Sequence, residues 1–148
     1  MAYQLLIPLT LIPTEETDPR RVEEVREQIL TAGRWTLPIM VEKDALFVMD
    51  GHHRLAVALQ LGLNVIPSVL LDYETVQVEA WRAGETITPE HIFDIVRRCC
   101  KFPIKTTRHI FKGELPACNV PLEELRRNPD LSKVSVPTPQ GGMLPYPT

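Results

Sequence analysis

The sequence lacks the long apolar run that a membrane-spanning helix needs. No window among its 148 residues approaches the roughly 18 to 20 consecutive apolar residues of a membrane span. The N-terminus also lacks the basic-then-apolar layout of a secretion signal. We therefore expect a cytoplasmic protein that has no membrane partner.

Cysteine is scarce, and its spacing fits neither a metal site nor a disulfide framework. The three cysteines, Cys99, Cys100 and Cys118, are odd in number and have no metal-ligand spacing. An adjacent pair rarely closes a disulfide on itself. We expect reduced thiols that serve as packing residues.

Positive charge is also in short supply, except in one segment. The net charge of −3 argues against a surface built to hold DNA. Between Ile95 and Gly113, however, there are six Lys or Arg residues and no carboxylate. This local excess predicts an anion site for a small phosphate ligand rather than for a long polyanion.

The pattern of apolar residues predicts alternating short strands and helices. Strands are expected in "YQLLIP", "LPIMVEK", "ALFVMD", "VIPSVLLDY" and "TVQVEAW". Helices are expected from Asp18 to Gly33, over about 52–61 with Gly62 as cap, in "TPEHIFDIVRRCC" with Thr88 as N-cap, and in "PLEELRRNP". The segment from Cys100 to Gly113 is expected to be irregular.

This order of elements, without a regular βαβ repeat, predicts a compact α+β domain with a small mixed sheet and flanking helices. We place the domain at residues 1–127 and a Pro/Gly-rich C-terminal tail at 128–148. The residues expected to face the core are Val22, Val25, Ile29 and Leu30 in the first helix, Leu55, Ala58 and Leu59 in the second, and Ile92, Ile95, Val96 and Cys99 in the third.

The stretch "VMDGHHRLAVALQLG" has the composition of an anion site. Gly51 lies where a strand passes into a helix, and the free amides of a first helical turn attract phosphate oxygens. His52, His53 and Arg54 would add donors. The alternative is a helix start with solvated histidines. A zinc site is not expected, because adjacent helical histidines point about 100° apart.

Two further segments carry polar groups suited to chemistry. "KTTRH", Lys105 to His109, offers cations, hydroxyls and an imidazole to a phosphate or polar substrate, or is a solvated basic loop. In "PTEETDP", Glu15 and Glu16 either stabilise a helix N-terminus or supply a general base. Trp81 is either a core aromatic or a pocket wall.

Taken in order, "IPLTLIPTEE", "LPIMVEKDALFVMDGHHRLAVALQLGLNVIPSVLLDY" and "KFPIKTTRH" resemble the free L-serine kinases of the ParB/sulfiredoxin-like superfamily. The resemblance runs from Leu6 to about Leu125. It implies the ParB/sulfiredoxin-like fold and a small-molecule kinase. The implied reaction transfers a phosphoryl group from ATP or ADP, with Mg²⁺, to the hydroxyl of free L-serine or a close amino acid and gives O-phospho-L-serine.

The resemblance also implies roles for individual residues. It makes Glu15 the catalytic base and places Asp50 beside the transferring phosphate, as the one candidate side chain for Mg²⁺. The residues implied to bind nucleotide phosphates are Gly51, His52, His53, Arg54, Lys105 and Thr106, and those implied to bind the amino acid are Trp81, Thr107, Arg108 and His109.

The sequence departs from the archaeal kinases of this group in one respect. It lacks an inserted region between Trp81 and "KTTRH", which leaves the acceptor and the phosphate donor open. The alternative is a ParB-like nucleotide-binding regulatory protein acting through a protein or DNA partner, since a "G-x-x-R" pattern starts at Gly51. Too few residues follow Gly113 for a DNA-binding module, so DNA binding is not expected. The oligomeric state is not predicted.

Overall fold

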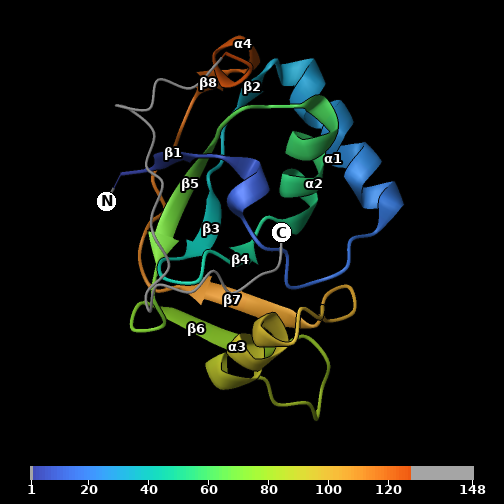
Figure 1. The fold of residues 1–148 in the computed structure, drawn as a ribbon, viewed down its shortest axis with the longest axis vertical. Helices are drawn as coiled ribbons and strands as arrows, with labels where there is room; N and C mark the ends of the chain where they lie inside the picture. The colour runs from blue at the N-terminus through green and yellow to red at the C-terminus, as the bar shows by residue number, and fades with distance from the viewer. Residues whose placement is uncertain (1, 128–148) are drawn as a thin grey trace.

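The computed structural model describes residues 2–127, and a four-stranded mixed sheet lies at its centre (Figure 1). The strand order is β1 (Gln4–Leu6), β5 (Ile66–Leu71), β3 (Ile39–Glu42) and β4 (Val48–Asp50). β3 and β5 are parallel, and the two outer pairs are antiparallel. The predicted α+β class with a small mixed sheet is confirmed. The tail expected over 128–148 lies outside the described residues, so this domain boundary stays a prediction.

Both faces of the sheet are covered, and β3 shows this most clearly. All four of its residues are buried. Ile39 and Val41 belong to one core cluster and Met40 belongs to the other, as the alternation of side chains along a strand requires. The buried carboxylate of Glu42 accepts hydrogen bonds from the backbone N–H groups of Asp44 and Ala45 in the following turn, so its oxygens are not left without partners.

Two helices, α1 (Pro19–Ala32) and α2 (His52–Leu61), lie together on one side of the sheet (Figure 1). The predicted caps of α1 are confirmed. The Asp18 carboxylate accepts the backbone N–H of Arg20, and Gly33 ends the helix with a φ of 67°. Gly62 ends α2 in the same left-handed conformation.

Three expected core residues are exposed, and for these the prediction is wrong. Leu30 and Leu59 are 39% and 45% exposed, whereas Val57 is buried between α2 and α1. In α2, one side of the helix packs against the sheet and another packs against α1, and Leu59 lies on neither of these buried sides. Cys99 is exposed because the helix α3 (Pro89–Arg97) ends before it and the chain turns there with a φ of 56°.

An antiparallel ribbon of β6 (Val76–Ala80) and β7 (Thr107–Phe111) lies at one end of the sheet, with α3 beside it (Figure 1). Thr88 caps α3 as predicted and forms a capping box with His91. The expectation that the chain is irregular after Cys100 is wrong for β7. Its pairing partner lies about 30 residues earlier in the chain, and this long-range pairing leaves no local signal in such a charged segment.

The opposite end of the molecule holds β2 (Arg34–Trp35), which pairs with β8 (Val120–Pro121), and the predicted short helix α4 (Leu122–Leu125) (Figure 1). A single 3₁₀ turn, η1 (Pro8–Thr10), follows β1.

The three cysteines are free thiols, and only Cys118 is buried. The expectation that the cysteines serve as packing residues is therefore wrong for Cys99 and Cys100. Over residues 2–127 no helix has the length and apolarity to cross a membrane. The cytoplasmic location stays a prediction.

Candidate active site

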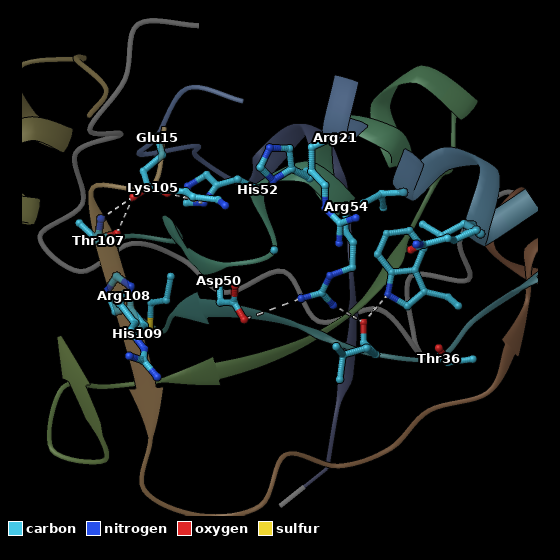
Figure 2. Close-up of a pocket in the computed structure, with 18 of the residues that line it drawn as sticks. Glu15, Arg21, Thr36, Asp50, His52, Arg54, Lys105, Thr107, Arg108 and His109 are labelled. Carbon is cyan, nitrogen blue, oxygen red and sulfur yellow. Dashed lines mark hydrogen bonds and ion pairs between the residues drawn. The ribbon is translucent and has the colours of Figure 1, made fainter. Parts of the chain in front are cut away.

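A pocket of about 580 Å³ brings the separate sequence motifs together (Figure 2). Its walls come from α1, β2, the end of β4, the start of α2, the residue after β6 and the start of β7. Eleven predicted site residues line it: Glu15, Asp50, Gly51, His52, His53, Arg54, Trp81, Lys105, Thr107, Arg108 and His109. The twelfth, Thr106, does not line the pocket; its hydroxyl donates to the Pro103 carbonyl at 2.7 Å.

Gly51 makes the junction between β4 and α2 possible. Its φ of 109° is a conformation that residues with a side chain rarely adopt. A Cβ added there would lie 2.5 Å from Cγ2 of Ile39, so the turn packs directly on the sheet. As the N-cap of α2, Gly51 offers no side-chain acceptor to the first amides of the helix, which belong to residues that line the pocket.

His52 is buried and electrically neutral. Its Nε2 accepts the backbone N–H of Thr14 at 3.0 Å, and its Nδ1 lies 3.8 Å from Oε2 of Glu15. Burial lowers the pKa of His52 to about 3, so the ring is uncharged at neutral pH. The alternative of a solvated histidine is therefore wrong for His52, and its role as a phosphate donor stays a prediction.

His53 and Arg54 also bind main-chain groups. Nε2 of His53 accepts the backbone N–H of Asp18, at the start of α1, at 3.1 Å. Burial lowers the pKa of His53 as well. Nη1 of Arg54 donates to the carbonyls of Leu37 and Pro38 at 2.6 and 3.0 Å. The first motif therefore ties α2 to α1 and to the segment before β3.

Glu15 is held by one of its two carboxylate oxygens. Oε1 accepts the backbone N–H of Thr106 at 3.0 Å, the backbone N–H of Thr107 at 2.6 Å and the Thr107 hydroxyl at 2.9 Å. Burial raises the pKa of Glu15, and these hydrogen bonds oppose the rise. Glu15 therefore does not serve the N-terminus of α1, and its Oε2 remains for a ligand.

Of the two candidate bases, only Glu15 faces the pocket. Glu16 is exposed and is not among the lining residues, while a backbone bridge to Phe102 fixes the chain at Glu15. This bridge joins the segment after η1 to the segment that leads into β7. The arrangement gives a fixed carboxylate with a raised pKa, which is what a general base requires.

Asp50, at the end of β4, projects its carboxylate into the space between the two motifs (Figure 2). Its side chain is 61% exposed, and Oδ2 lies 4.0 Å from Nη2 of Arg54. No cluster of three His, Cys, Asp or Glu residues that suits a metal occurs within residues 2–127. A cation here would need ligands from a bound molecule in addition to Asp50.

The second motif presents charge at the opposite wall. Lys105 adopts a left-handed φ of 54° directly before the two amides that hold Glu15. Cζ of Arg108 lies 5.0 Å from the ring centre of Trp81. Trp81 is 52% exposed, so it forms part of the pocket wall and is not a core residue. Residues 107–109 belong to β7 and are therefore not a loop, whereas the cations Lys105 and Arg108 are exposed to solvent.

His109, also in β7, is a half-buried residue of this wall. Its Nε2 lies 2.9 Å from the Tyr73 hydroxyl, and burial lowers the pKa of His109 to about 4. Burial also raises the pKa of Tyr73 above its ordinary range. Both groups are therefore neutral at pH 7, and the wall behind the cations is uncharged.

The contribution of α1 to the pocket was not predicted from the sequence. Arg21, Gln28 and Ala32 line the pocket together with Val25 and Ile29, and Arg34 and Thr36 extend the same wall. Positions 21, 25, 28 and 32 recur at the spacing of a single helix face. That spacing is the only signal in the sequence, and it gains meaning only once the pocket is known.

Comparison with curated proteins finds relatives at modest identity, and no family model matches the chain. A "ParB-like protein" of Sulfolobus acidocaldarius is 38% identical over 60% of this chain and 45% of its own length. An "ATP-dependent L-serine kinase" of Staphylothermus marinus is 36% identical over 48% of this chain. An "ADP-dependent L-serine kinase SerK" of Thermococcus kodakarensis is 33% identical over 47% of this chain. The matches to the two kinases span 31% of those proteins, so the chain covers less than half of the relatives it matches.

Comparison with solved structures gives wider coverage. A free serine kinase in complex with AMP superposes with a TM-score of 0.77 at 18% identity, over 84% of this chain and 94% of that one. SbnI of Staphylococcus aureus, truncated at its C-terminus, gives 0.80 at 14% identity, over 89% and 92%. The chain thus has the fold of these proteins, and its predicted resemblance to the free serine kinases is confirmed.

Proposed function

We propose that the chain is a free serine kinase, which transfers a phosphoryl group from ATP or ADP to the hydroxyl of L-serine. The product would be O-phospho-L-serine, a precursor for amino-acid biosynthesis. Support comes from the similarity to L-serine kinases in sequence and to a nucleotide-bound free serine kinase in fold. The proposal applies to the pocket described above.

The observation that carries the proposal is the placement of Glu15 in one pocket with Lys105 and Arg108. Phosphoryl transfer to an alcohol needs a carboxylate that receives the hydroxyl proton and cations that stabilise charge on the phosphate oxygens. In the proposed reaction Oε2 of Glu15 takes the proton of the serine hydroxyl. The hydroxyl oxygen then bonds to the terminal phosphorus, and the nucleotide leaves with one phosphate fewer.

The remaining lining residues receive roles by position. The amides at Gly51 and the side chains of His53, Arg54 and Lys105 would surround the nucleotide phosphates. Thr106 would act through its backbone, which holds Glu15. The lining residues from the β6–β7 ribbon and the residue after β6 would bind the amino acid: Trp81, Thr107, Arg108 and His109.

Asp50 is the residue that would hold Mg²⁺. Within residues 2–127 there is no three-ligand cluster, but Mg²⁺ is commonly held by one or two carboxylates together with phosphate oxygens and water. The exposed carboxylate of Asp50 fits that mode. When bound, the ion neutralises charge on the transferring phosphate.

A direct assay tests the proposal. Purified chain is incubated with Mg²⁺, with ATP or ADP, and with a panel of free amino acids that contains L-serine, L-threonine and L-homoserine. Mass spectrometry should detect phosphoserine with one of the two donors, and L-alanine serves as the acceptor without a hydroxyl. Nucleotide binding without any phosphorylated amino acid would contradict the proposal.

That contrary result would favour the alternative of a ParB-like nucleotide-binding regulator. The similarity to the "ParB-like protein" of Sulfolobus acidocaldarius is the observation behind this alternative. A regulator needs the phosphate-binding walls but has no use for a carboxylate with a free oxygen. The presence of Glu15 in the pocket therefore favours the kinase.

A further inference from the structure

We propose that His52 is a positioning residue for Glu15 and not a phosphate ligand. The inference rests on the proposed function, because it assigns a role in turnover. It starts from a buried imidazole whose two nitrogens face two consecutive residues of the segment between η1 and α1. One nitrogen meets the chain at Thr14, and the other meets the carboxylate of Glu15.

The hydrogen bond from Thr14 fixes the tautomer of His52. A backbone N–H can only donate, so the Nε2 atom that it meets at 3.0 Å must offer a lone pair. A neutral imidazole carries one proton, which then lies on Nδ1. The Thr14 hydroxyl donates its one proton to the Val48 carbonyl at 3.1 Å, so in this tautomer its 3.1 Å contact with Nε2 is not a hydrogen bond.

The Nδ1–H group points toward the only Glu15 oxygen that lacks a donor among the described residues. Oε1 already accepts three hydrogen bonds, whereas Oε2 lies 3.8 Å from Nδ1 of His52. The distance is longer than a hydrogen bond, so the attraction is that of a dipole for a charge. It favours the orientation in which Oε2 faces the pocket.

The same geometry leaves His52 a single donor, Nδ1–H, and a carboxylate oxygen of Glu15 lies beside that donor. Nε2 is used by Thr14, and Nδ1–H is directed at Glu15. Because Nδ1 already carries a proton, the ring also cannot accept the proton that Glu15 removes from serine. That proton has to leave Glu15 through the pocket. His52 thus orients the base and takes no part in proton transfer.

Two substitutions at His52 test the two ring nitrogens separately, because each keeps the hydrogen-bonding function of only one of them. In His52→Asn the amide nitrogen can replace the Nδ1–H donor, whereas in His52→Gln the amide oxygen can replace Nε2 as the acceptor for Thr14. We expect H52Q to lower kcat by at least about tenfold with an unchanged nucleotide Kd, since a misplaced catalytic group can cost up to about 100-fold. We expect H52N to recover most of that loss, although it unfolds at lower urea. A weakened nucleotide Kd in both variants, with normal kcat, would overturn the proposal.

A spectroscopic measurement tests the tautomer without reference to activity. Long-range ¹H–¹⁵N correlation spectra of the ¹⁵N-histidine-labelled chain at pH 7 should show His52 protonated on Nδ1 only, both alone and with ATP. Protonation on Nε2, or on both nitrogens when nucleotide is added, would overturn the proposal. If no amino acid is phosphorylated, the proposed function fails by itself, and these spectra still decide whether His52 donates toward Glu15.

Discussion

The two basic motifs that line the pocket have similar compositions but are built differently. In the first motif, residues 50–54, the side chains of His52, His53 and Arg54 bind main-chain groups from three other segments. In the second motif, residues 105–109, the backbone holds Glu15 instead. Among the described residues, the Lys105 side chain has neither a hydrogen bond nor an ion pair.

This difference follows from where the motifs lie in the fold. The first motif lies at the start of α2, between α1 and the sheet, where buried polar groups must be satisfied. The second begins at the exposed edge of the β6–β7 ribbon, where cations stay hydrated. A cluster of cationic residues in a sequence can therefore either stabilise the fold or form a ligand site. Substitutions in the first motif should mainly lower stability, and those in the second should mainly weaken binding.

The largest loss of stability is expected at Gly51. Gly51→Ala places a Cβ 2.5 Å from Ile39 and keeps a left-handed φ, and together these should cost about 3 kcal/mol or more of unfolding free energy. Gly62→Ala is the matched control, because Gly62 also has a positive φ but no atom lies within 4 Å of the added Cβ. It should cost about 1 kcal/mol. Equal losses in urea denaturation would contradict the close approach at Gly51.

Replacing one cationic residue in each motif with methionine tests whether the first motif mainly stabilises the fold and the second mainly binds a ligand. Arg54→Met leaves the Leu37 and Pro38 carbonyls without their donor and should lower the free energy of unfolding by about 2 kcal/mol. Lys105→Met should change it by less than about 0.5 kcal/mol and weaken nucleotide binding about tenfold. Urea denaturation and calorimetric titration measure the two effects. The reverse pattern would show that the roles are exchanged.

Buried histidines make stability depend on pH. The pKa of His109 is about 4 in the folded chain and near 6.5 when exposed, so the unfolded state binds more protons between these values. Stability is fully present above pH 6.5 and falls on acidification, with a slope of up to about 1.4 kcal/mol per pH unit from this residue. Glu15 and Glu42, whose pKa values are raised, oppose the fall, so the comparison between variants is the useful one.

His109→Gln should reduce this slope between pH 6.5 and 4.5, as measured by urea denaturation at several pH values. His91→Gln is the control, since His91 is exposed and a glutamine keeps its capping geometry. An unchanged slope in H109Q would mean that His109 is charged in the folded chain.

The smallest effect is expected at the rim of the second motif. The face of Trp81 lies under the Arg108 guanidinium, an arrangement that contributes about 0.5 to 1 kcal/mol. Trp81→Leu should therefore raise the KM for L-serine about threefold to fivefold, and Trp81→Phe should raise it less. Stability should barely change, because Trp81 is half exposed. An unchanged KM in both variants would remove Trp81 from the acceptor site.

The parts of the fold that local sequence determines were predictable. Asp18, Gly33, Gly62 and Thr88 set helix ends through backbone groups within a few residues, so their patterns are visible in the sequence. Strand β7 was not predictable, because it exists through pairing with β6.

The same distinction applies to the site. The polar clusters could be found, since their composition is local. The hydrogen bond that His52 accepts comes from Thr14, 38 positions away, and the fixed oxygen of Glu15 depends on amides 91 and 92 positions away. Arg21 carries no motif and joins the pocket only because α1 packs on α2. Contacts between residues so far apart in the sequence can be identified only when the fold is known.

The role of Glu15 as the base is tested by comparing phosphoserine formation by Glu15→Gln and Glu16→Gln. Glutamine retains the hydrogen-bond acceptor for Thr106 and Thr107 but cannot take the serine proton, so E15Q should lose about 10²-fold to 10⁴-fold in kcat and keep its affinity for ATP or ADP. E16Q changes an exposed residue outside the pocket and should remain within about twofold of the unaltered chain. Normal turnover in E15Q would contradict the account.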